Sequence, residues 1–231
     1  MLDLTTDKGR FVSAALALAA ERPWQEVTLA DIAERAGSTL VALKGQFSSK
    51  DAILSAFTTL VDDEVLTRAP RRDPEQAARD ALFEVIMSRF DVLEPWKPAI
   101  RSIARSGPPE PGRLAGMMAS SRWMLEAAGI GSGGMEGVAR TAGLAAVYAA
   151  VFRTWLDDDD TGLARTMAAL DRRLRRGERT MQRADDMMRG LRRVASAVLG
   201  TAETLRSRMD DVRRGTRPAD PAPPPPSTPT P

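Results

Sequence analysis

Residues 28–54 read TLADIAERAGSTLVALKGQFSSKDAIL, and their spacing predicts two short helices around a tight turn, followed by the start of a third helix. Thr28 and Asp31 form a capping box, in which a hydroxyl and a carboxylate satisfy N–H groups that the first helical turn leaves unpaired. Gly37 ends the first helix, because glycine tolerates the positive φ that follows many helix ends. A helix, a tight turn and a second helix are the geometry that places the second helix in the major groove of DNA.

The same stretch resembles the N-terminal domain of the TetR-type transcriptional regulators. The shared residues are Ile32-Ala33, Ala36-Gly37, Leu43, Phe47 and Ser49-Lys50-Asp51. The resemblance covers roughly the first 60 residues. It implies an all-α, TetR-like fold with a three-helix head over residues 1–68 and a larger helical domain over 73–179, which binds an effector and dimerises.

The second helix of the pair reads operator DNA in that family. This chain has Lys44 and Gln46 where the family usually has Tyr and His, so the residues left to contact bases are Thr39, Lys44 and Gln46. The resemblance implies that Lys50 contacts a phosphate. The chemistry fits, because glutamine can pair with adenine and lysine with guanine.

Three residues of the same helix favour another interpretation, a head that keeps the fold but no longer reads DNA. Leu40 and Val41 stand where the family has small or polar residues, so they are candidates to pack against protein instead. Gly45 weakens the helix by about 1 kcal/mol relative to alanine. Residues 1–60 carry six Lys and Arg against seven Asp and Glu, a net of −1, whereas dedicated DNA readers usually show a basic face.

Composition excludes several classes of site. The 231 residues include no Cys and no His, which removes thiolate metal sites, the commonest general base and the commonest transition-metal ligand. We therefore predict no enzyme activity, no cofactor and no metal, and we interpret the four acids at 157–160 as a solvated helix end.

The longest apolar run, 141–152, is too short for a bilayer, which needs about 20 residues. With no segment resembling a signal peptide, we expect a cytoplasmic protein.

The larger domain is rich in Met and aromatic residues that are candidates to line a pocket. Taken alone, this pattern is more typical of an ordinary core, although Met adapts well to varied ligands. The TetR resemblance implies an effector pocket, and hence an apolar small-molecule effector. The candidate lining residues are Met117, Met118, Trp123, Met124, Tyr148, Phe152 and Trp155. Helical spacing also places Arg89 on the apolar inner face of the helix that begins this domain.

Residues 81–103 and 144–173 suggest a second resemblance, to accessory proteins of ubiquinone biosynthesis. Those proteins have a TetR-like fold, bind lipids or quinone precursors and present a terminal amphipathic helix to membranes. The alternative function is therefore a lipid- or quinone-binding accessory protein that does not bind DNA.

The C-terminal region concentrates the positive charge of the chain. Residues 171–217 hold 14 Arg against 7 acidic residues, a net of +7, and 180–214 have the spacing of a basic amphipathic helix. This helix could dock on protein as part of a homodimer, lie on anionic lipid, or contact nucleic acid. Its candidate partner-binding residues are Met187, Met188, Arg189, Leu191, Arg192 and Arg193. The Pro-rich residues 215–231 are predicted to be disordered.

Overall fold

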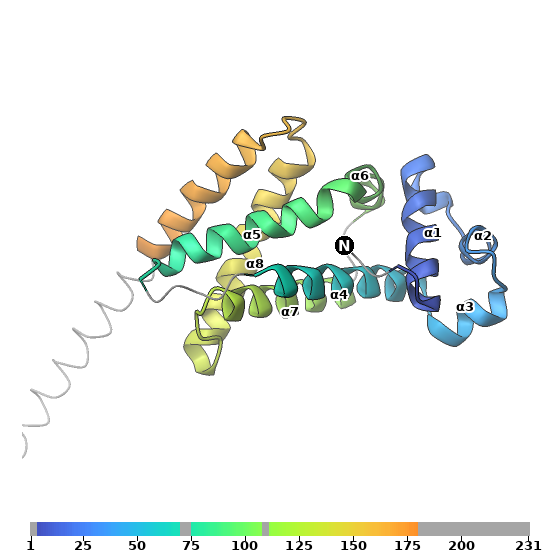
Figure 1. The fold of residues 1–231 in the computed structure, drawn as a ribbon, viewed down its shortest axis with the longest axis horizontal. Coiled ribbons are helices and arrows are strands. Elements are labelled where there is room, and N and C mark those ends of the chain that lie inside the picture. The colour runs from blue at the N-terminus through green and yellow to red at the C-terminus, as the bar shows by residue number, and fades with distance from the viewer. Residues whose placement is uncertain (1–3, 70–74, 108–110, 180–231) are drawn as a thin grey trace, which may run out of the picture. The chain divides into compact units, whose positions relative to one another are not determined.

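The computed structural model describes residues 4–69, 75–107 and 111–179, and these residues form helices without a β-strand (Figure 1). The all-α prediction is therefore confirmed. The helices are α1 (Asp7–Glu21), α2 (Leu29–Arg35), α3 (Leu40–Gln46), α4 (Lys50–Arg68), α5 (Ala78–Leu93), α6 (Lys97–Arg105), α7 (Pro111–Ala127) and α8 (Gly134–Leu156), with 3-10 turns η1 (Trp24–Glu26) and η2 (Glu94–Trp96). A further helix is described over 164–179. The predicted terminal helix, including Met187 to Arg193, and the Pro-rich tail lie outside the described residues.

The start of each short helix in the head follows the predicted caps. Thr28 Oγ1 accepts from the Asp31 N–H at 3.1 Å, and Asp31 Oδ2 accepts from the Thr28 N–H at 2.8 Å. Thr39 and Ser49 cap α3 and α4 in the same way, each through a hydroxyl oxygen that accepts a backbone N–H at 3.1 Å. Gly37 adopts a φ of 62° after α2, as its position in the sequence predicts.

One hydrophobic core runs from the head into the body, by which we mean the described residues from 75 to 179. In the head, the ring of Phe47 meets that of Phe11 edge-on, with centroids 6.3 Å apart. The helix α4 packs on α1 within the head and on α5 and α7 within the body, and α1 also packs on α6. The predicted boundary at residues 68–73 thus falls between α4 and α5, yet buried side chains on both sides of it belong to the same cluster.

Hydrogen bonds join the head to α6 as well. The Trp24 N–H donates to Ser102 Oγ at 3.0 Å, and Ser102 Oγ donates to the carbonyl of Arg22 at 3.2 Å. Gln25 Nε2 donates to the carbonyl of Ser106 at 2.8 Å. The head is therefore joined to the following helices in two ways: through α4, and through these hydrogen bonds to α6 and Ser106.

The acidic run after α8 differs from its prediction at one position. Asp158 is only 1% exposed, so the run is not a uniformly solvated helix end. Its Oδ2 accepts from the N–H of Thr166 at 2.8 Å and from the Thr166 hydroxyl at 2.7 Å. Asp158 therefore fixes the start of the 164–179 helix, a role that spacing within the run does not reveal.

No helix among the described residues is both long enough and apolar enough to cross a membrane.

Candidate functional site

The surface of α3 is almost wholly available to a partner. Leu43 is the buried residue of this seven-residue helix, and it anchors α3 against the head. The predicted base-contacting residues Thr39, Lys44 and Gln46 are all exposed. Thr39 also caps the helix through its oxygen, which leaves its O–H free to donate. Their predicted contacts with bases remain predictions, but all three side chains are accessible.

Lys50 lies differently from the other three predicted residues. Its ammonium donates to the carbonyls of Trp24 and Val27, both at 2.6 Å, and lies 4.3 Å from the centroid of the Trp24 ring. Burial lowers the pKa of Lys50. Two of its three N–H donors are thus used inside the head, which gives Lys50 a structural role at η1. A phosphate contact would use the third donor, and it stays a prediction.

Half of the six cations in residues 1–60 are already paired with carboxylates. Three cations meet carboxylates at N–O distances of 2.5 or 2.6 Å: Arg10 with Asp7, Arg22 with Asp31, and Arg35 with Glu21. Lys8 and Lys44 have no ion-pair partner among the described residues. Lys44 is therefore the cation that α3 itself offers to a polyanion.

The two apolar residues at the start of α3 do not pack inside the described chain. Leu40 is 51% exposed and Val41 is 80% exposed, so the described residues do not bury them, and the interpretation that they pack against a partner stays a prediction. Gly45 has no steric reason to lack a side chain, because a Cβ added there would meet nothing within 4 Å.

The predicted pocket residues differ widely in how far they are buried. Met124, Tyr148 and Trp155 are buried, whereas Trp123 is 54% exposed and so does not line an interior site. Met117, Met118 and Phe152 are partly buried. The rings of Tyr148 and Trp155 stack on Phe90, with centroids 5.6 and 5.4 Å apart. Tyr148, Phe152 and Trp155 form a packed aromatic core with Phe90 in this structure. The role of the seven residues as a pocket stays a prediction.

A buried charged network lies beside that aromatic core. Arg89 of α5 is 5% exposed, and its guanidinium donates to Asp62 of α4 through Nη1 and to the Tyr148 hydroxyl of α8 through Nε at 3.1 Å. Ser120 of α7 donates to the second oxygen of Asp62 at 2.6 Å. Although burial disfavours its charged form, the neighbouring Tyr148 and Asp62 raise the pKa of Arg89. The network ties four helices together and holds α4 to the body.

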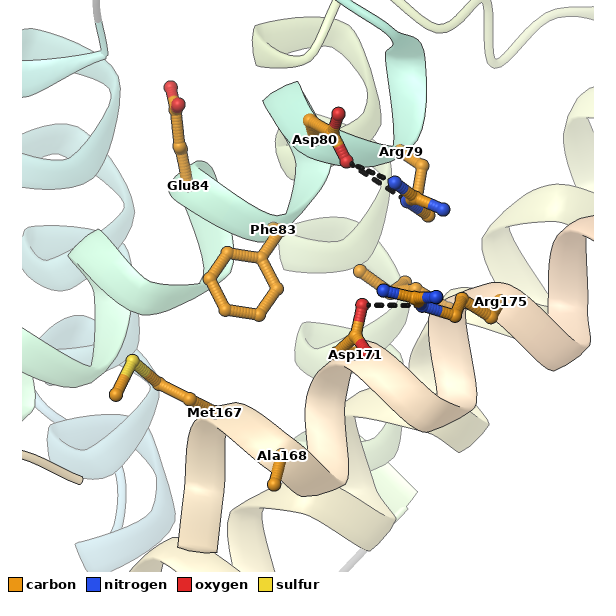
Figure 2. Close-up of a pocket in the computed structure, with 9 residues that line it drawn as sticks. Arg79, Asp80, Phe83, Glu84, Met167, Ala168, Asp171 and Arg175 are labelled. Atoms are coloured by element: carbon orange, nitrogen blue, oxygen red, sulfur yellow. Dashed lines mark hydrogen bonds and ion pairs between the residues drawn. The ribbon is translucent and has the colours of Figure 1, made fainter. Parts of the chain in front are cut away.

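A groove opens on the other side of α5, against the 164–179 helix (Figure 2). Its volume is about 460 Å³, and Phe83 and Met167 contribute apolar surface between the two helices. Ion pairs of Arg79 with Asp80 (2.8 Å) and of Arg175 with Asp171 (2.9 Å) lie along it. A second groove of about 410 Å³ shares Phe83 and Met167 with the first. Neither groove could be predicted from the sequence, because each is formed by two segments that lie far apart in the chain.

Comparison with known proteins agrees with this arrangement. Residues 11–57 match the sequence model of the family described as bacterial regulatory proteins, tetR family. A TetR transcriptional regulator from Nitrosomonas europaea ATCC 19718 superposes with a TM-score of 0.59 at 23% identity, over 73% of this chain and 96% of that chain. One from Rhodococcus sp. RHA1 has a TM-score of 0.52 at 22% identity, over 71% and 93%. No curated protein matches the chain. The predicted resemblance to TetR regulators is confirmed, whereas the one to ubiquinone-biosynthesis proteins finds no support.

Proposed function

Because its head matches the tetR family of bacterial regulatory proteins and its fold is that of solved TetR regulators, we propose that this protein is a transcriptional regulator that binds operator DNA as a homodimer and responds to an apolar small molecule. The observation that carries the proposal is the exposure of α3. This helix follows a Gly37 turn, is anchored through Leu43, and presents Thr39, Lys44 and Gln46 to solvent. Such a helix can enter the major groove.

Replacing Lys44 by alanine should weaken binding to the preferred operator by about 1–3 kcal/mol if Lys44 reads a base. Fluorescence anisotropy with the upstream DNA of the gene and a scrambled fragment, across a salt series, measures this effect. Lys8→Ala is the matched control, because it removes the same charge from α1. If Lys44→Ala weakened binding to the upstream and the scrambled fragment equally, Lys44 would contribute only nonspecific electrostatic attraction to DNA. Absence of any sequence preference in the unmodified protein would argue against the regulator itself.

A homodimer is supported by the outer face of α8. Met135 and Val138 are 88% and 63% exposed, and Ala142 and Ala146 continue the same face at helical spacing and are also exposed. Small side chains let two helices approach closely, and a two-fold axis would place two heads on two operator half-sites.

Ala142→Glu should convert the dimer to a monomer, because it puts a carboxylate on that face opposite its symmetry mate. Sedimentation velocity at micromolar concentration measures the change, and operator affinity should fall with it. Ala115→Glu, at an exposed position on α7, is the matched control and should leave the dimer intact. If Ala142→Glu remained a dimer, the dimer interface could not be this face of α8.

The effector is supported by the groove beside Phe83 and Met167, whose volume falls within the range of small-molecule sites. A ligand that pushes α5 away from the 164–179 helix would act on α4, because α5 packs on α4. Since α4 begins directly after α3, a shift of α4 changes the position of the reading helix. Ligand and operator would then oppose each other through one conformational equilibrium. Release of operator by apolar compounds in the anisotropy assay tests this step.

A further inference from the structure

The apolar pair Leu40 and Val41 lies at the start of α3, one helical turn before the exposed Lys44. Val41 is 80% exposed and Leu40 is 51% exposed, and α3 is a short helix with one buried anchor. A β-branched residue such as valine is also a weaker helix former than the polar residues common on helix surfaces. The packing of the described chain explains neither apolar residue, and the stability of α3 does not explain Val41.

Their position relative to Lys44 indicates which partner would explain them. Leu40 precedes Lys44 by four residues and Val41 precedes it by three, so all three lie next to one another on the helix surface. Lys44 provides the positive charge that fits a DNA groove. The apolar pair is therefore continuous with the surface proposed to read the operator.

The major groove offers one apolar group to such a pair. Thymine carries a C5-methyl there, and the other three bases have no methyl group. Aliphatic side chains that reach the groove floor would thus favour thymine through apolar contact.

Gly45 supports a close approach of α3 to the bases. It lies one turn after Val41 on the same face, and alanine would fit there without touching anything within 4 Å. Alanine would also stabilise the helix. A glycine at such a position is explained by a partner outside the chain that comes near the backbone.

We propose that Leu40 and Val41 are specificity-determining residues that recognise thymine C5-methyl groups in the operator, with Gly45 allowing α3 to come close enough for this contact. The inference rests on the proposed function, since it requires that α3 enters the major groove. It adds the class of base that the helix selects.

Replacing thymine by deoxyuridine in the operator removes only the methyl group and tests this directly. The preferred duplex is first selected with the full-length protein, and each thymine is then replaced in turn. We expect about a three- to fivefold loss of affinity for each contacted methyl. In Leu40→Ala and Val41→Ala, the loss at the corresponding thymine should disappear. Leu114→Ala, at another exposed leucine on α7, is the matched control and should keep the full loss.

The possible outcomes distinguish the proposed regulator function from the proposed recognition of thymine methyl groups. A protein that prefers one operator but binds thymine and deoxyuridine duplexes equally would overturn the inference and leave the regulator function in place. Methyl sensitivity that persists unchanged in both variants would assign it to other residues. A protein without any preferred DNA would overturn both. Gly45→Ala gives an independent measurement: it should unfold at a higher temperature yet bind the operator more weakly, and unchanged affinity would contradict the close approach.

Discussion

Replacing Asp62 by alanine should lower the free energy of unfolding by about 3–5 kcal/mol, because it leaves the buried guanidinium of Arg89 without its counter-charge. Arg89 is 5% exposed, and arginine does not lose its proton under ordinary conditions, so the charge cannot be removed by titration. Tyr148 and Ser120 would remain as neutral partners only. Urea denaturation followed by circular dichroism measures the loss.

Two further variants separate the ion pair from its surroundings. Asp63→Ala changes the next residue of α4, which is exposed, and should alter stability by no more than about 0.5 kcal/mol. The double variant Asp62→Leu with Arg89→Met replaces both charges by apolar groups and should recover most of the loss. Equal effects of Asp62→Ala and Asp63→Ala would show that Arg89 does not depend on this carboxylate.

The same network also affects the placement of α3, because Asp62 belongs to α4. This helix starts at the cap after α3 and continues into the body, where Arg89, Ser120 and Tyr148 hold it from three other helices. The orientation of α3 is therefore set partly by contacts between α4 and the helices that follow it. An effector that disturbs α5 would act on α4 through Arg89 as well as through apolar packing.

Local features of the head could be predicted from the sequence because they depend on neighbouring residues. The capping box of Thr28 and Asp31 joins residues three positions apart, and Gly37 acts through its own backbone. The exposure of Lys44 follows from helical spacing around Leu43. These signals predicted the helix-turn-helix geometry of the head, whereas the TetR-like fold was expected from the family resemblance of residues such as Ile32-Ala33 and Phe47.

The remaining features depend on contacts between distant residues, which spacing does not reveal. Lys50 meets the carbonyl of Trp24 across 26 residues, and Arg89 meets Tyr148 across 59. Helical periodicity placed Arg89 on an inner face but could not identify Asp62 as its partner. The exposure of Trp123 was missed for a similar reason: an aromatic residue in an apolar stripe is usually buried, and only the packing of α7 decides which face is covered.

Replacing Gly137 by alanine should lower the free energy of unfolding by about 3 kcal/mol or more, through overpacking at the start of α8. A Cβ at this position would lie 2.0 Å from the carbonyl oxygen of Ser132 and 2.1 Å from its carbon, both backbone atoms. The turn cannot easily move aside, because Glu126 accepts from the N–H and the hydroxyl of Ser132, and Arg122 Nε donates to that hydroxyl at 3.1 Å.

The control for this substitution is Gly116→Ala in α7, where a Cβ would meet nothing within 4 Å. Alanine should stabilise that helix by about 1 kcal/mol, so the same chemical change is expected to have opposite signs at the two positions. Thermal and urea unfolding of both variants measure the difference. Equal stability of Gly137→Ala and the unmodified protein would mean that the turn between α7 and α8 can move. The contacts of Ser132 would then not hold the start of α8 in place. Because α8 also carries Tyr148 and the proposed dimer face, Gly137→Ala should weaken dimer formation even under conditions where the chain remains folded.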